Sequence, residues 1–312
     1  MEVIMNNSRT KVLYIAGSGR SGSTILQSIL GQIDGFSAMG ELCYVWGCFD
    51  APCECGILLP ECKIWKAVLG EAFGDIDHID VQKMSRLAES FRIYDLPSVL
   101  IPHIRQKHVS RLREYLDNVE KLYRAIQSTT DSRVIVDSSK SAAYGYLLQM
   151  IPAIELYVVH LIRDSRATAY SWTRKKLFRP NTTYYMARHH PARSSWQWNA
   201  RNITAEVYLR QTPAHYMKLR YEDFVDKPQE SIARILSLLG ETDVHLPFVA
   251  EHTVEISKTN HSVFGNLVRF KTGMVELKMD EEWKTKMKRT HKITVTALTW
   301  PLLLKYRYLP RR

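Results

Sequence analysis

The sequence predicts an α/β fold in which helices cover both faces of a central parallel sheet, and three apolar runs carry this prediction. VLYIA at 12–16, VIVD at 134–137 and LYVVHLI at 156–162 are short, β-rich and almost continuously apolar, as strands buried on both faces are. Helical patterns follow the first two runs, at 25–33 and 144–148. Strands that alternate with helices are typical of a parallel sheet, so we expect three layers.

The C-terminal third continues the alternation of strands and helices. HYMKLRYE predicts another strand, and DKPQESIARILSLLG predicts a helix with Asp226 as its N-cap and Gly240 as its C-cap. We expect a last helix from Asp280 toward Tyr306, which Pro301 kinks or ends.

The chain is long enough for one large core. It has 312 residues with 45% apolar content, and we expect a single domain over 1–312. Two stretches, at 63–131 and 176–211, look like helical or looped additions, and the second contains TTYYMARHH. Because such insertions often carry recognition, we expect them to form the substrate side of any site.

The charge of the chain favours an anionic partner. A formal net charge of +11 suits nucleic acid, acidic membranes or phosphorylated nucleotides alike. The basic residues are spread along the chain rather than gathered in a tail, so we expect no nucleic-acid partner. A non-catalytic polyanion-binding protein is the alternative, and it would show steep salt dependence without nucleotide preference.

Membrane signals are weak in this sequence. The first ten residues lack the apolar core of a secretory signal, and no stretch offers the ~18 uncharged apolar residues of a membrane span. We therefore expect a cytoplasmic protein without a membrane partner. The sequence does not indicate an oligomeric state.

The segment GSGRSGST at 17–24 lies between a predicted strand and a predicted helix. Free backbone N–H groups and the helix dipole favour an anion at such a junction. Arg20 adds a positive charge, and Ser21, Ser23 and Thr24 add hydroxyl donors. The loop therefore predicts a phosphate-like ligand, with a glycine-rich turn that holds no ligand as the simpler alternative.

This loop is close to the nucleotide-triphosphate motif G-x-x-x-x-G-K-[ST] and differs at one position. Gly17, Gly22 and Thr24 match the motif, but Ser23 stands where the motif has lysine. A kinase or NTPase acting on a small substrate is therefore the alternative function. It would require ATP and magnesium while lacking its main β- and γ-phosphate contact.

A second anion site is predicted in HLIRDSRATAYSW at 160–172. Arg163 comes just past the end of an apolar strand, and Ser171 follows eight residues later. In open α/β sheets ligands bind beyond the carboxyl ends of the strands, so both residues should face the crevice of the first loop. Arginine can fork two hydrogen bonds to a phosphate. Surface ion pairs among Arg163, Asp164 and Arg166 are the alternative.

Together the two motifs resemble those of the superfamily of sulfotransferases that use 3'-phosphoadenosine 5'-phosphosulfate (PAPS). Its members pair a strand-loop-helix site for the 5'-phosphosulfate with an Arg-x7-Ser site for the 3'-phosphate. GSGRSGST is similar to the first, with arginine where cytosolic members have lysine, as in the tyrosylprotein and carbohydrate branches. RDSRATAYS is similar to the second. VIVDSSK, LRYEDFVDKPQESIARILSLLG and NHSVFGNLVRF extend the resemblance over Lys11 to Tyr308.

The resemblance implies a P-loop-like three-layer fold with acceptor-side helical insertions. It implies transfer of a sulfuryl group from PAPS to a hydroxyl or amine of a small-molecule acceptor, leaving adenosine 3',5'-bisphosphate (PAP) and requiring no metal. The prokaryotic look of the motifs favours a natural product or other metabolite as acceptor, with a saccharide next.

Most of the expected nucleotide contacts also follow from the resemblance. In the first loop they are Arg20, Ser21, Gly22, Ser23 and Thr24, and in the second anion site they are Arg163 and Ser171. Outside both sites they are Lys175, Tyr221 and Arg269, with Arg174 as the alternative to Lys175.

The resemblance also suggests catalytic residues. Glu41 in SAMGELCYVWG is similar to the glutamate that the tyrosylprotein branch uses as general base, and a cap or surface role is its alternative. Lys140 in VDSSK should stabilise charge on the transferring group together with Arg20, and a surface position is its alternative. Other branches use histidine, so the rival bases are His160, His189 and His190.

All five cysteines lie in the first fifth of the chain, at positions Cys43, Cys48, Cys53, Cys55 and Cys62. CECGILLPECKIW is similar to a stretch in prokaryotic-looking family members, and it lacks two C-x-x-C pairs. Structural zinc, a disulfide and reduced thiols all remain open. At the catalytic site we predict no metal.

Overall fold

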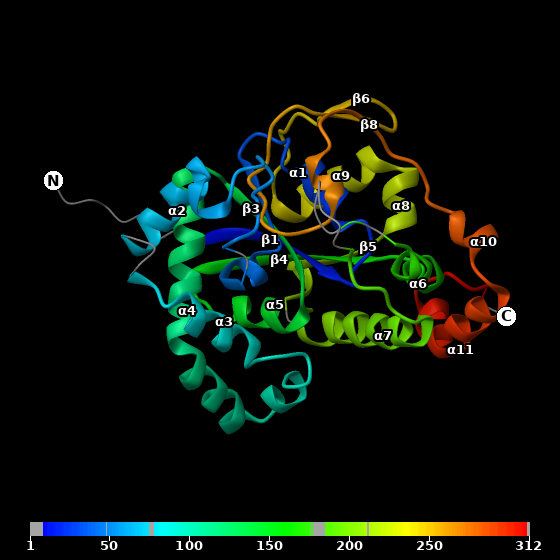
Figure 1. The fold of residues 1–312 in the computed structure, drawn as a ribbon, viewed down its shortest axis with the longest axis horizontal. Helices are drawn as coiled ribbons and strands as arrows, with labels where there is room; N and C mark the ends of the chain where they lie inside the picture. The colour runs from blue at the N-terminus through cyan, green and yellow to red at the C-terminus, as the bar shows by residue number, and fades with distance from the viewer. Residues whose placement is uncertain are drawn as a thin grey trace.

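A five-stranded sheet with all neighbours parallel lies at the centre of the molecule, in the order β2-β3-β1-β4-β5 (Figure 1). The computed structural model describes residues 9–47, 49–74, 78–175, 177, 185–210 and 212–310. The strands are β1 Thr10–Gly17, β2 Phe36–Gly40, β3 Val134–Lys140, β4 Ile154–Ile162 and β5 Tyr216–Arg220. The predicted parallel α/β fold is confirmed.

Helices cover both faces of the sheet, because side chains of β1 alternate between two cores. Val12 and Tyr14 pack with α4, α5 and α7, whereas Leu13 and Ile15 pack with α1 and α9. The helices are α1 Ser23–Leu30, α2 Lys63–Phe73, α3 Val81–Glu89, α4 Pro102–Thr130, α5 Ala142–Gln149, α6 Ser165–Thr173, α7 Pro191–Tyr208, α8 Tyr221–Asp226, α9 Pro228–Leu239, α10 Glu282–Lys286 and α11 Arg289–Lys305.

A small antiparallel sheet, which the sequence did not predict, lies above the α1 and α9 layer (Figure 1). Its strands are β6 Phe248–Ala250, β7 Thr253–Ile256 and β8 Gly273–Glu276. They are only three or four residues long, too short for a clear alternation of apolar and polar side chains.

The stretch at 63–131 forms α2, α3 and α4 with the connections between them. The second stretch supplies α7. Cys48 and residues 178–184, which include the start of TTYYMARHH, lie outside the described residues. Within the described part of the chain, no helix combines the length and apolarity that crossing a membrane requires.

Two predicted helix boundaries are wrong. Asp226 closes α8, and Lys227 is the N-cap of α9, because Pro228 at the first helical position keeps the residue before it out of the helical region. Gly240 is the C-cap with φ 70°, as predicted. The last helix is divided into α10 and α11 by an extended turn.

Pro301 lies inside α11 rather than at its end. A proline removes one backbone hydrogen bond and crowds the preceding turn, so such a helix needs support from its neighbours. α7 provides it, since Asn199 Nδ2 donates to the carbonyl of Leu298 at 2.8 Å. Packing against α7 therefore stabilises the helical conformation of α11 around Pro301.

His160, one of the rival bases, is fully buried between β5 and α7. Its Nε2–H donates to Asn202 Oδ1 at 2.8 Å, and its Nδ1 accepts from the Tyr216 hydroxyl at 2.7 Å. Burial lowers the pKa of His160 from 6.5 to about 4, so the ring is neutral in the native state. His160 is thus a structural histidine.

This burial has a consequence for stability below neutral pH. The unfolded chain binds a proton at His160 with a pKa near 6.5 and the native chain only near 4, so stability falls as pH falls through this window. From pH 7 to about pH 5 we expect His160 to cost about 2 kcal/mol. Urea unfolding at both pH values should show this loss in the wild type and not in His160→Gln.

His245, which is exposed, is the matched control, and His245→Gln should retain the pH dependence of the wild type. Equal pH dependence of the wild type and His160→Gln would show that His160 is not held neutral.

Candidate active site

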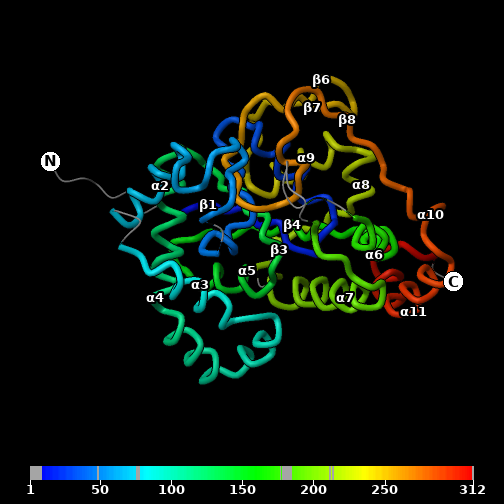
Figure 2. Tube along the Cα trace, viewed as in Figure 1, coloured from blue at the N-terminus to red at the C-terminus, as the bar shows by residue number. Residues whose placement is uncertain are grey.

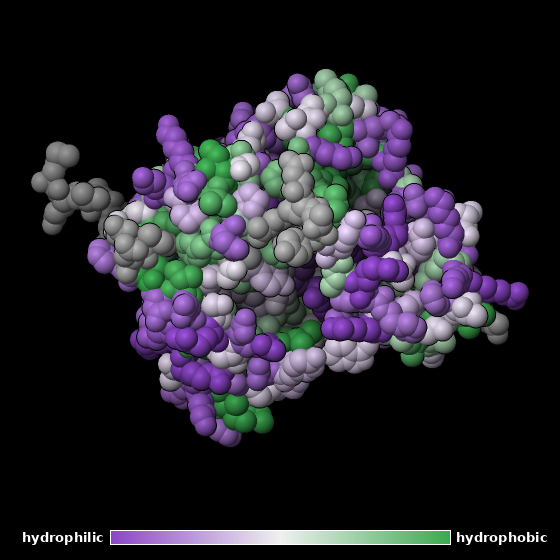
Figure 3. All heavy atoms as spheres, viewed as in Figure 1, coloured by the Kyte–Doolittle hydropathy of each residue, from purple (hydrophilic) through white to green (hydrophobic). Residues whose placement is uncertain are grey.

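A cavity of about 650 Å³ opens at the carboxyl edge of β1, β3 and β4. Its walls come from the loop after β1, the turn after β3, Arg163 after β4, the last turn of α6 and the segment 264–268. The space-filling view shows this face hollowed near its centre, with hydrophilic side chains along the rim (Figure 3). Ligand sites of open α/β sheets are expected at this edge, and the volume suits a small-molecule ligand.

The loop after β1 has the geometry of an anion cradle. Gly22 has φ 94°, and a Cβ there would lie 2.5 Å from the Tyr221 ring, so the close approach requires glycine. Ser21 Oγ braces the loop by donating to the Ser18 carbonyl at 2.8 Å. α1 begins at Ser23 without a side-chain cap, which leaves its first N–H groups directed toward the cavity wall.

Arg20 lies in the same loop in a strained backbone conformation, with φ 68°. Its guanidinium stacks 4.7 Å from the Trp172 ring, and Nη2 donates to Met186 Sδ at 3.1 Å. Burial lowers its pKa. Nε is buried and has no hydrogen-bond partner among the described residues. An anion in the cavity would supply the missing acceptor.

Arg163 and Ser171 line the same cavity, so the structure brings the two predicted anion sites together. Arg163 Nη1 donates to the Arg20 carbonyl at 3.2 Å, and Nη2 lies 3.1 Å from Asp280 Oδ2. Its guanidinium stacks 4.4 Å from the Tyr221 ring. Its buried Nε, like that of Arg20, has no partner within the described chain.

Of the ion-pair alternative only the pair between Asp164 and Arg166 forms, and it is not on the surface, since Asp164 is 5% exposed. Arg166 forks onto Asp164, with Nη2 at 2.6 Å from Oδ2, and neither residue lines the cavity. The run 163–166 therefore combines an arginine that lines the cavity with an ion pair that does not.

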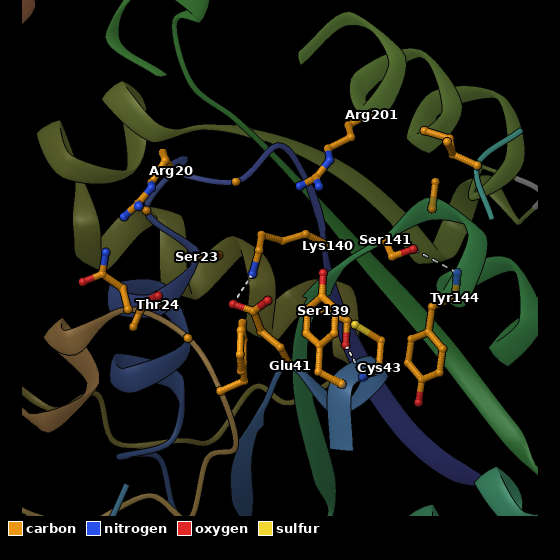
Figure 4. Close-up of a pocket in the computed structure, with 18 of the residues that line it drawn as sticks. Arg20, Ser23, Thr24, Glu41, Cys43, Ser139, Lys140, Ser141, Tyr144 and Arg201 are labelled. Carbon is orange, nitrogen blue, oxygen red and sulfur yellow. Dashed lines mark hydrogen bonds and ion pairs between the residues drawn. The ribbon is translucent and has the colours of Figure 1, made fainter. Parts of the chain in front are cut away.

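Glu41 and Lys140 form a buried ion pair in the cavity wall, with Nζ 2.8 Å from Oε1 (Figure 4). They are only 9% and 8% exposed, which excludes the surface alternatives for both. Lys140 has φ 65°, and its Nζ also donates to the Ser138 carbonyl at 2.7 Å. The strained backbone turns the ammonium group toward Glu41.

Asp137, which sequence reasoning did not select, holds this turn in place. It accepts from Ser139 N at 2.8 Å, from Ser139 Oγ at 2.5 Å and from the Tyr123 hydroxyl at 2.5 Å. Ser139 Oγ in turn accepts from Cys43 N at 3.0 Å. Burial raises the pKa of Asp137 to about 6. The network ties the segment after Glu41 to the turn that carries Lys140.

Four predicted nucleotide contacts do not line the cavity, and the first of them, Ser21, braces the loop after β1 instead. Lys175 is exposed, with Nζ 3.9 Å from the Tyr185 ring. Tyr221 lies behind the loop against Gly22. Arg269 is buried and donates to the carbonyls of Pro52, Ser262 and Phe264 at 2.9–3.1 Å, so it braces the wall from outside.

The remaining rival histidines also lie apart. His189 stacks on Trp172 with ring centroids 4.4 Å apart, and His190 is exposed at the start of α7. Among the described residues that line the cavity there is no histidine. Glu41 is the acid–base candidate that the geometry favours.

Several lining residues gave no recognisable signal in the sequence. Arg201 of α7 and Trp172 of α6 flank Gly19, since a Cβ at Gly19 would lie 3.6 and 3.0 Å from their side chains. Figure 4 shows Arg201 extending toward Lys140. Aromatic rings line the cavity as well, from Tyr44, Phe91, Tyr144 and Phe264.

The comparisons with known proteins show the family and the fold of the chain. A model of the sulfotransferase family matches residues 13–244. The sulfotransferase domain from the curacin biosynthetic pathway has a similar fold, with 17% identity and a TM-score of 0.52 over 95% of this chain and 98% of that one. The sulfotransferase domain of the Synechococcus PCC 7002 olefin synthase shows 16% identity and a TM-score of 0.51, covering 95% of each chain.

No curated protein matches this sequence significantly. The family model nevertheless spans well over half of the chain and includes β1, the loop after it, the Glu41–Lys140 pair and Arg163. The chain belongs to the sulfotransferase family.

Proposed function

We propose that this sulfotransferase uses PAPS as its donor and transfers the sulfuryl group to a hydroxyl or amine of a small molecule. The observation that carries the proposal is the convergence, in one cavity, of the loop after β1, Arg163 with Ser171, and the buried Glu41–Lys140 pair. The first two offer two separate anion sites, as a donor with phosphate at both 5' and 3' positions requires.

The residues present fit such a donor. Arg20, Ser23 and Thr24 with the first N–H groups of α1 would hold the phosphosulfate, and Arg163 and Ser171 would hold the 3'-phosphate. Both arginines keep a buried Nε without a partner among the described residues, and such groups are costly unless a ligand satisfies them. We assign Lys175, Tyr221 and Arg269 supporting roles at most, because they do not line the cavity.

Bound PAPS supplies an activated sulfuryl group whose leaving group is PAP. Glu41 accepts the proton of the acceptor as the new bond to sulfur forms and the bond from sulfur to the phosphate oxygen breaks. Lys140 lies beside Glu41, keeps the carboxylate oriented and places a positive charge near the transferring group. The chain thereby provides the base and the charge stabilisation from two adjacent strand ends.

The acceptor side is aromatic. Tyr44, Phe91, Tyr144 and Phe264 line the part of the cavity formed by the turn after β2, the first insertion, the start of α5 and the segment 264–268. Such walls favour a largely apolar acceptor over a hydrated saccharide. The two similar structures come from a biosynthetic pathway and an olefin synthase, which supports a natural product or related metabolite as the acceptor.

The donor is tested by calorimetric titration with PAP and, separately, with ATP plus magnesium at physiological salt. We expect tight, metal-independent binding of PAP, because Arg163 and Ser171 would engage its 3'-phosphate. Preference for ATP with magnesium would overturn the proposal and favour the kinase or NTPase. Weak binding of both ligands with steep salt dependence would favour a polyanion-binding protein.

Arg163→Ala should weaken PAP binding by on the order of 10-fold or more, because it removes a charged donor to the 3'-phosphate. Adenosine 5'-phosphate, which lacks that group, should bind almost unchanged. Arg166→Ala is the matched control, since Arg166 pairs with Asp164 outside the cavity. Equal losses for both nucleotides would count against a 3'-phosphate site at Arg163.

Glu41→Gln should lower turnover by on the order of 10²-fold or more while PAP binding stays close to that of the wild type. Glutamine keeps the size of the side chain and cannot accept the proton. Glu89 is the other carboxylate among the described lining residues, and Glu89→Gln should cause a much smaller loss because it leaves the ion pair intact. Normal turnover of Glu41→Gln would exclude the assignment.

A further inference from the structure

Three cysteines and one histidine converge on the side of the molecule behind the aromatic wall. Cys62 Sγ lies 3.2 Å from His261 Nδ1 and 3.6 Å from Cys55 Sγ, and Cys53 Sγ lies 3.7 Å from His261 Nδ1. All four ligand atoms lie within 4.8 Å of one another. His261 is 199 residues away from Cys62 in the chain, so the convergence is a product of the fold.

These distances are close to those between the ligand atoms of a tetrahedral zinc site. With Zn–S near 2.3 Å and Zn–N near 2.05 Å, tetrahedral angles place two sulfurs about 3.8 Å apart and a sulfur and a nitrogen about 3.6 Å apart. The Cys55–Cys62 sulfur separation and the two separations from sulfur to His261 Nδ1 scatter around these values. Three thiolates and one imidazole are a ligand set of structural zinc sites.

Backbone hydrogen bonds and burial hold Cys53, Cys62 and His261 in place. Cys53 lies in a tight turn, with its N–H donating to the Ile57 carbonyl at 2.8 Å and its carbonyl accepting from Gly56 N at 2.9 Å. The backbone of His261 is fixed by Trp65, whose Nε1 donates to its carbonyl at 2.7 Å. Cys53 and Cys62 are fully buried. Four protein ligands leave no open position, which characterises a structural site.

A disulfide explains the cluster less well. The sulfurs of Cys55 and Cys62 are 3.6 Å apart, compared with about 2.05 Å in a disulfide. A disulfide between any two of the three cysteines would leave the third thiol beside His261 without a partner. Cys43 takes no part, because it lies at the catalytic cavity. Three thiols gathered on one imidazole have a simple physical purpose only if a cation binds between them.

We propose that Cys53, Cys55, Cys62 and His261 bind one structural zinc ion. From the sequence, zinc was one of three open possibilities, because the three cysteines alone form no complete site. The structure adds the fourth ligand from a distant segment. The ion is separate from the chemistry, so the prediction of no metal at the catalytic site is unaffected.

The ion would fasten together two segments that form the catalytic wall. Beside the cluster, Glu54 N donates to the Ser262 carbonyl at 3.1 Å. One residue further, Val263 pairs with Gly40, and its carbonyl accepts from Glu41 N at 2.9 Å. In Figure 2, the segment after β7 runs beside the N-terminal segment that contains the cysteines. Zinc would therefore anchor the segment 261–263, whose backbone positions Glu41.

The test is elemental analysis of the full-length chain, purified without a metal-binding tag, incubated with zinc and freed of excess metal. We expect about one zinc ion per chain, and replacement by Co²⁺ should produce the visible absorption of tetrahedral thiolate-bound cobalt. Less than about 0.2 zinc per chain with freely reactive thiols would overturn the proposal. Loss of two thiols that a reductant restores would show a disulfide instead.

Variants separate the site from adventitious binding. His261→Ala and Cys55→Ser should each lose the ion, whereas His245→Ala and Cys43→Ser should keep it. A chelator should lower the thermal unfolding midpoint of the wild type and leave that of His261→Ala unchanged. Zinc retained in both ligand variants would overturn the assignment. If neither variant folds, the zinc content and cobalt spectrum of the wild type still decide.

Discussion

The parallel alignment of β1, β3 and β4 is the constraint on which the site depends. Because the three strands run in the same direction, their carboxyl ends meet at one edge and bring the loop after β1, Lys140 and Arg163 to one cavity. The ladder is irregular here, since Tyr14 pairs with Asp137 but Ala16 pairs with Lys140. The extra residue on β3 redirects Lys140 toward the cavity, as bulges beside active sites do.

The charges at this edge are costly to bury, and the fold compensates each of them locally. Lys140 meets Glu41 and a carbonyl, and Asp137 accepts three hydrogen bonds. Buried ion pairs contribute little net stability, because desolvation offsets the attraction. Their value here is positional, since a base and a cation held by packed strands keep their orientation before any ligand binds. Arg20 and Arg163 differ in that each keeps an unsatisfied buried nitrogen, which a ligand can satisfy.

The segment after β7 connects two parts of the molecule that the chain order keeps apart. Val263 joins the edge of the central sheet through Gly40, Phe264 forms part of the aromatic wall, and Arg269 gathers carbonyls from both sides of the cysteine cluster. An interaction that restricts the motion of this segment would also restrict the motion of the backbone around Glu41. Backbone hydrogen bonds of this segment therefore connect the cysteine cluster to the wall of the catalytic cavity.

By itself the sequence determined the parallel α/β fold and predicted an anion site at the loop 17–24 and at Arg163, because apolar periodicity and short motifs are local properties of the chain. Glu41 was predicted from the family resemblance alone. Tertiary structure decided which residues meet. The Glu41–Lys140 pair, the approach of Arg201 to the loop and the union of His261 with the cysteines join residues far apart in the chain. Such contacts produce no recognisable residue spacing in the sequence, because the packing of the strands and helices alone sets the distances between these residues.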